Sequence, residues 1–94
     1  MARETANETA GNQLAWMMGW LNYKGQATDR NGASDRIYMK QRHAFCVEWK
    51  RKNGARRKTQ KTEQKLCNDH GVPYYFCDSL ESFRDVLLLE ESKL

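Results

Sequence analysis

Apolar residues at helical spacing predict a helix over residues 7–24, ended by Gly25. They fall on two stripes of that helix. The first stripe consists of Leu14, Met17, Met18 and Leu21. The second consists of Trp16, Trp20 and Tyr23. Two interpretations remain open: both stripes face one core, or one of them contacts a second subunit. Residues 1–6 precede this pattern and are expected to be frayed.

The middle of the chain alternates apolar and polar residues and predicts a β-hairpin. Its strands are residues 35–40 and 44–50, joined by a turn at residues 41–43. The polar stretch before them contains the turn signal Asn31-Gly32 and a candidate short strand at residues 26–30. Three strands are therefore expected between the first and second helices.

The C-terminal part of the chain predicts two more helices with a strand between them. The first of these helices runs from about residue 58 or 59 to His70, where Gly71 stops it. A short apolar strand follows at residues 73–77, and Asp78 then caps the last helix, with Glu81 at the capping-box position. The order helix, three strands, helix, strand, helix predicts an α/β (α+β) sandwich, in which helices flank a small mixed sheet.

The composition describes one small basic domain over residues 1–94. Its formal net charge of +4 favours a polyanionic partner, and its thin core would gain from a second chain. The chain has no apolar run long enough to span a membrane and no signal segment at its N-terminus. We therefore expect a cytoplasmic protein that is neither secreted nor bound to a membrane. The odd number of cysteines, without CxxC spacing, is typical of reduced intracellular thiols.

Asp35, Glu48 and Lys50 are the candidate catalytic residues. Glu48 and Lys50 occupy alternate positions of the second hairpin strand, so their side chains emerge on the same face. The other face of this strand carries Phe45, Val47 and Trp49. One or two carboxylates can hold a divalent metal ion with positions open for water and phosphate, and a nearby lysine can orient or deprotonate that water. The set predicts phosphodiester hydrolysis; the alternative is a Glu–Lys pair on an exposed strand face.

Residues 50–61 form a basic segment without an acidic residue, which predicts contact with a phosphate backbone. The candidate DNA-binding residues are Arg51, Lys52, Arg56, Arg57, Lys58 and Lys61. The alternative is an ordinary solvated run of charges. Gln60 and Gln64, one helical turn apart, are both placed to reach from the following helix toward the site, unless they simply face solvent.

The ordered set of these motifs resembles the VRR-NUC family, the virus-type replication-repair nucleases of the PD-(D/E)xK superfamily. The resemblance runs from about Gly25 to Leu88. Its pieces are Gly32-Ala33-Ser34-Asp35 for the family's G-x-P-D, Val47-Glu48-Trp49-Lys50 for its hydrophobic-E-x-K, Gly54 and Gln60 for its G-x5-Q, then Gly71-Val72-Pro73 and Ser79-Leu80-Glu81-Ser82-Phe83. In two places the chain departs from the family: Ser34 replaces a proline, and the acidic residue usual in the first helix is missing before Gln13. Either Glu8 takes that role one turn earlier, or the role is vacant.

The resemblance implies a restriction-endonuclease-like core and metal-dependent cleavage of DNA. By it, Asp35 and Glu48 would ligate Mg²⁺ or Mn²⁺ together with the backbone carbonyl of Trp49, with Glu8 as a further candidate ligand. Lys50 would position the attacking water, and Gln60 would support the site. Short stand-alone members of phage or bacterial type act as homodimers on branched DNA such as four-way junctions, so we expect DNA as the partner and a homodimer. The alternatives are a non-catalytic basic DNA-binding module and a small phage accessory protein that binds a partner through its aromatic helix.

Overall fold

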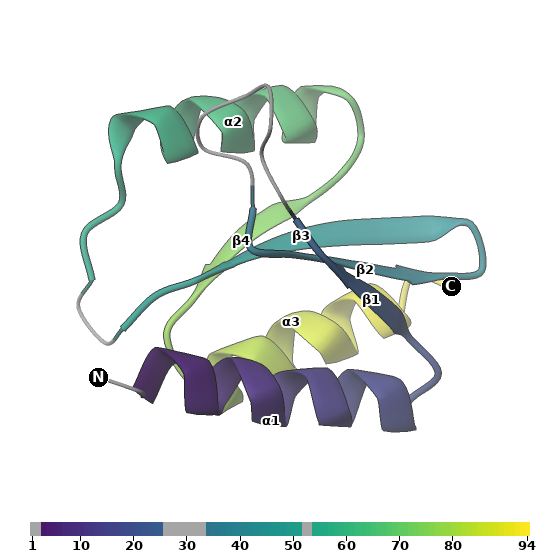
Figure 1. The fold of residues 1–94 in the computed structure, drawn as a ribbon. Helices are drawn as coiled ribbons and strands as arrows, with labels where there is room; N and C mark the ends of the chain where they lie inside the picture. The colour runs from purple at the N-terminus through teal and green to yellow at the C-terminus, as the bar shows by residue number, and fades with distance from the viewer. Residues whose placement is uncertain (1–2, 26–33, 52–53) are drawn as a thin grey trace.

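The computed structural model describes residues 3–25, 34–51 and 54–94, and in it helices cover both faces of a four-stranded sheet (Figure 1). The elements in chain order are α1 (Arg3–Met17), β1 (Leu21–Lys24), β2 (Arg36–Lys40), β3 (His43–Trp49), α2 (Lys58–Asp69), β4 (Tyr74–Cys77) and α3 (Leu80–Glu91). The strands lie side by side in the order β1-β2-β3-β4. The first three are antiparallel and β4 is parallel to β3, so the predicted mixed sheet and the predicted order of elements are confirmed.

The core lies between one face of the sheet and the pair α1 and α3, while α2 covers the opposite face (Figure 1). Phe45, Val47 and Trp49 of β3 are all fully buried in this core, as the alternation of the strand predicted. Phe83 and Leu87 of α3 pack against them. The other face of β3 is thereby left to face α2, and this is the face that carries Glu48.

The first helix is shorter at its C-terminal end than predicted. It starts at Arg3, so residues 3–6 are assigned to the helix, and it ends at Met17 instead of residue 24. Gly19 adopts a positive φ of 91°, a conformation that favours glycine and ends the helix. The chain then reverses into β1, which occupies the last residues of the predicted helix. The strand predicted at residues 26–30 lies outside the described residues.

This reversal separates the residues of the two predicted stripes. Trp20 is fully buried in the core, where its indole N–H donates to Glu91 over 2.8 Å. Trp16 and Met17 are instead 66% and 80% exposed, and Leu21 is also exposed on β1. Neither stripe is therefore buried as a unit.

Within the described part of the chain, no helix has the length and apolar character needed to cross a membrane.

The remaining predicted elements are close to those observed. The hairpin turns at Gln41 and Arg42, both with positive φ, and His43 already belongs to β3. The predicted cap of the last helix is wrong by one residue, because Ser79, not Asp78, is the N-cap of α3. The Ser79 hydroxyl oxygen accepts from the Ser82 backbone N–H over 3.0 Å, so Ser82 takes the position expected for Glu81.

Candidate active site

Two strand ends bring the candidate catalytic residues together. β2 and β3 are antiparallel with Arg36 opposite Val47, so the residue before β2 lies beside the C-terminal end of β3. Asp35 occupies that position, and its carboxylate accepts from the Trp49 backbone N–H over 2.8 Å. Residues 13 positions apart in the sequence, Asp35 and Glu48, thus meet at one end of the sheet.

Glu48 points from β3 toward α2 and is only 6% exposed. Its Oε2 accepts from the side-chain amide of Gln60 over 2.7 Å. The ammonium nitrogen of Lys50 lies 3.7 Å from the same oxygen. This burial excludes the alternative of a Glu–Lys pair on an exposed strand face. The Glu48 carboxylate, the Lys50 ammonium group and the Gln60 amide lie around one point.

Gln60 fixes the orientation of Glu48 from the first turn of α2. It is 1% exposed, and its amide oxygen accepts from the Arg57 backbone N–H over 3.1 Å. Because the oxygen is engaged in this way, the amide N–H group is the part that faces Glu48. Gln64 has a different role: it donates to the Tyr74 carbonyl over 2.9 Å and joins α2 to β4.

Glu8 forms an ion pair with Arg36, whose Nε lies 2.7 Å from the carboxylate. The same guanidinium donates to Asn22 over 3.2 Å. The structure therefore shows Glu8 joining α1 to β2 next to the candidate site. Its role as a metal ligand stays a prediction.

The basic segment lies beside this group of residues. Arg51, Arg56, Arg57, Lys58 and Lys61 are all exposed, while Lys52 lies outside the described residues. The guanidinium carbon of Arg56 lies over the ring of Phe76, 4.7 Å from its centroid, in a cation–π contact. Sequence reasoning missed this contact, because Phe76 belongs to β4 and the parallel pairing of β4 with β3 brings it opposite Glu48.

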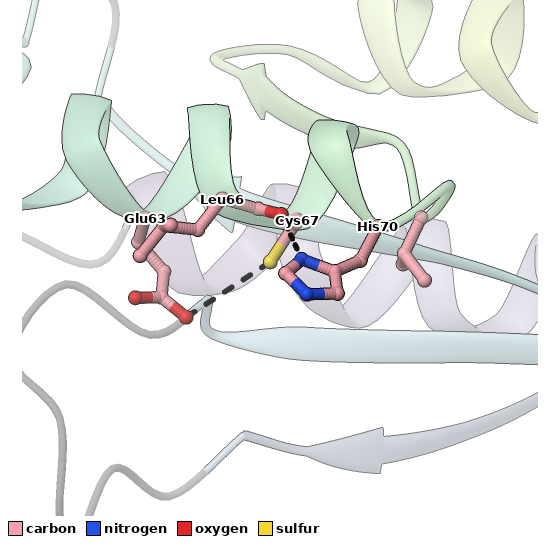
Figure 2. Close-up of a pocket in the computed structure, with 5 residues that line it drawn as sticks. Glu63, Leu66, Cys67 and His70 are labelled. Carbon is pink, nitrogen blue, oxygen red and sulfur yellow. Dashed lines mark hydrogen bonds between the residues drawn. The ribbon is translucent and has the colours of Figure 1, made fainter.

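A separate cavity of about 340 Å³ lies along α2 (Figure 2). It is lined by Glu63, Leu66, Cys67, His70 and Val72. His70 Nδ1 is 2.9 Å from the carbonyl of Leu66 in the last turn of α2. The Cys67 thiol donates to Glu63 over 3.9 Å. This lining carries an acidic residue and no lysine or arginine, so it does not suit a polyanion.

The oxygen atoms at the sheet end suit a hard divalent cation. Asp35 and Glu48 supply carboxylates, and the Trp49 carbonyl is the backbone oxygen between Glu48 and Lys50. Mg²⁺ is typically bound by one or two protein carboxylates, with waters and phosphate oxygens completing its shell. The described residues contain no cluster of three or more histidine, cysteine or acidic side chains that could hold a metal ion.

Comparisons with known proteins bear on the fold. No family model matches the sequence, and no curated protein matches it. A solved structure described as "VRR_NUC domain" superposes with a TM-score of 0.82 over 90% of this chain and 94% of that chain, at 18% sequence identity. The fold predicted from the motif order is therefore confirmed: this chain has the fold of a VRR-NUC domain.

Proposed function

We propose that the protein is a metal-dependent deoxyribonuclease that hydrolyses phosphodiester bonds. The observation that carries the proposal is the convergence of Asp35, Glu48 and Lys50 at one end of the sheet, with Gln60 bonded to Glu48. In the sequence, these residues are among those that carry the resemblance to the VRR-NUC motifs. The similarity in fold to a VRR_NUC domain supports the proposal of a nuclease.

Each residue has a distinct task in this proposal. Mg²⁺ or Mn²⁺, held by Asp35, Glu48 and the Trp49 carbonyl, would neutralise phosphate charge and acidify a bound water. Gln60 keeps the Glu48 carboxylate in one orientation, which reduces the reorganisation needed during the reaction. Lys50 stands beside Glu48, where its ammonium group would donate to the attacking water and orient it toward the phosphorus.

We infer that the substrate is DNA and that the protein acts as a homodimer on branched forms such as four-way junctions. The exposed basic residues after β3 supply phosphate contacts, and the net charge of +4 favours them. Large apolar side chains remain exposed around the junction of α1 and β1, and a second copy would cover them. These side chains are Trp16, Met17, Leu21 and Tyr23. Action in the cytoplasm of a bacterial or phage-infected cell is consistent with the three reduced cysteines.

A cleavage assay on linear, nicked and four-way duplexes, with Mg²⁺, Mn²⁺ or EDTA, tests this function. We expect cleavage only with a divalent metal, and we expect Lys50→Ala to abolish it while DNA binding in EDTA persists. DNA binding that depends steeply on salt, without cleavage of any substrate, would instead favour the non-catalytic module. Absence of both would favour the accessory interaction protein.

A further inference from the structure

A polar crevice of about 420 Å³ adjoins the candidate active site and shares Lys50 with it. It lies at the C-terminal ends of the parallel strands β3 and β4, where the Lys50 backbone N–H donates to the Cys77 carbonyl over 2.8 Å. The crevice is lined by Lys50, Arg51, Gly54, Arg56, Phe76, Cys77, Asp78 and Ser82. Ligands commonly bind at the carboxyl ends of parallel strands, because loops and helix starts converge there.

The charge of the lining favours an anion. Among the described residues of the lining, Lys50, Arg51 and Arg56 contribute three cations, against the single carboxylate of Asp78. The guanidinium carbon of Arg56 lies over Phe76, 4.7 Å from the ring centroid, in a cation–π contact. A guanidinium presents its N–H donors as a fork, a geometry that matches two phosphate oxygens.

We propose that this crevice binds a phosphodiester next to the scissile one in the DNA strand. The inference rests on the proposed function, because Lys50 is the residue that the crevice and the candidate active site have in common. A strand whose scissile phosphate lies at the cation that Asp35 and Glu48 would hold would extend past Lys50 and place the neighbouring phosphate against Arg56 and Arg51. Among the described residues of the lining, Phe76 is the aromatic side chain on which a base could stack, and Arg56 already covers that ring.

The proposal divides the basic segment into two groups. Arg51 and Arg56 line the crevice and would contact one defined phosphate. Arg57 and Lys58 are exposed, at the start of α2, and do not line it. They would contribute a diffuse attraction that does not depend on one position of the strand. Asp78 opposes the bound anion, so its removal should strengthen binding.

Binding measured in EDTA tests the crevice without requiring cleavage. The ligands are the trinucleotide TpTpT and the same trinucleotide with a neutral methylphosphonate in place of either phosphate, titrated against ¹⁵N-labelled protein and followed by NMR. We expect the wild type to prefer TpTpT by roughly fivefold over at least one of the substituted ligands. Arg56→Gln should lose most of that preference, and Asp78→Asn should bind TpTpT roughly threefold more tightly.

Two exposed residues on α3 provide matched controls, since neither lines the crevice. Arg84→Gln removes a cation and Asp85→Asn removes an acid, and both should behave as the wild type. If Arg56→Gln and Arg84→Gln weaken binding equally, or if the preference for TpTpT survives in Arg56→Gln, the crevice is not a phosphate site. A protein that shows the crevice effects but never cleaves DNA would overturn the nuclease proposal alone. Cleavage by the wild type without these effects would overturn the crevice alone.

Discussion

Gln60 engages both ends of its side-chain amide: the oxygen accepts from the Arg57 backbone, and the nitrogen donates to Glu48. A buried carboxylate needs such a donor, because the cost of removing it from water is otherwise uncompensated. The position of Glu48 therefore depends on a residue of α2 as well as on its own strand. At the scale of single residues, the candidate site therefore includes Gln60 of α2 in addition to Asp35, Glu48 and Lys50.

Gln60→Ala should weaken both the fold and the activity. Loss of the hydrogen bond to buried Glu48 should lower the free energy of unfolding by about 2 kcal/mol. The metal concentration needed for half-maximal cleavage should rise, because Glu48 is no longer held in one orientation. Gln64→Ala is the matched control: it loses a bond to the neutral Tyr74 carbonyl, should cost about 1 kcal/mol, and should leave the metal requirement unchanged. Equal metal requirements in the two variants would contradict the positioning role.

Asp35→Asn and Glu48→Gln should abolish cleavage while the fold persists. The amide oxygen of Asn at position 35 can still accept from the Trp49 backbone, so little packing changes. The lost charge should lower the single-turnover rate at least roughly a hundredfold and weaken Mn²⁺ binding in a calorimetric titration. Asp85→Asn, which neutralises an exposed acid on α3, should alter neither quantity. Near wild-type cleavage by Asp35→Asn would remove this residue from the catalytic set.

At the scale of elements, the alternation within β3 was sufficient to predict which residues face the core and which face the site. The end of α1 was not predictable in the same way. Trp16 and Trp20 repeat at helical spacing, yet Gly19 turns the chain and sends them in different directions. Local periodicity does not record such a reversal, because the burial of Trp20 in the core outweighs the helical preference of the segment.

The candidate site likewise combines contacts that the sequence predicts with contacts that it does not predict. The proximity of Asp35, Glu48, Lys50 and Gln60 was expected, because their spacing in sequence follows a motif, and their roles in catalysis stay predictions. The cation–π contact of Arg56 with Phe76 was not predicted, since it requires the register of the parallel pair β3–β4. Contacts between residues of distant elements depend on that register, which no local pattern states.

Buried Glu90 of α3 makes further contacts that the sequence did not predict, and these contacts join α3 to the sheet. It is fully buried and hydrogen-bonded to His43 of β3 and Tyr75 of β4, and it accepts from Lys93 over 2.9 Å. Burial alone would raise the pKa of Glu90, but the hydrogen bonds from Tyr75, His43 and Lys93 together hold this pKa below its usual value. A carboxyl with a lowered pKa in the folded state stabilises the fold when ionised.

The stabilising effect of Glu90 should therefore depend on pH. It is fully present above the ordinary glutamate pKa of about 4.3 and is lost as the pH falls through the lower pKa of the folded state. Glu90→Gln should be less stable than the wild type at pH 7, and the difference should shrink as the pH is lowered below about 4. Urea unfolding at a series of pH values measures this difference. A difference that stays constant from pH 7 to pH 3 would show that the ionised form of Glu90 has no special role.

At the scale of the whole molecule, the exposed apolar residues suggest how two copies would associate. One active site cuts one strand, whereas a four-way junction presents two equivalent strands, so a twofold dimer would supply two sites at a fixed separation. Trp16, on the second predicted stripe, is 66% exposed on α1 and is available to a second copy. Trp20, on the same predicted stripe, is fully buried in the core of its own chain, so the expected interface would have to use Trp16.

Trp16→Glu should therefore dissociate a homodimer without unfolding the chain. Covering the exposed part of this indole contributes about 2 kcal/mol, roughly a thirtyfold change in the dissociation constant per copy. Leu89→Glu, a change at a half-exposed residue of α3, is the matched control and should leave the dimer intact. Trp20→Glu, by contrast, places a charge in the core and should unfold the protein. Sedimentation equilibrium at micromolar concentration, with circular dichroism for folding, separates these outcomes. A wild type that is monomeric and still cuts four-way junctions would show that junction cleavage does not need a dimer, and Trp16 would then be an ordinary surface residue.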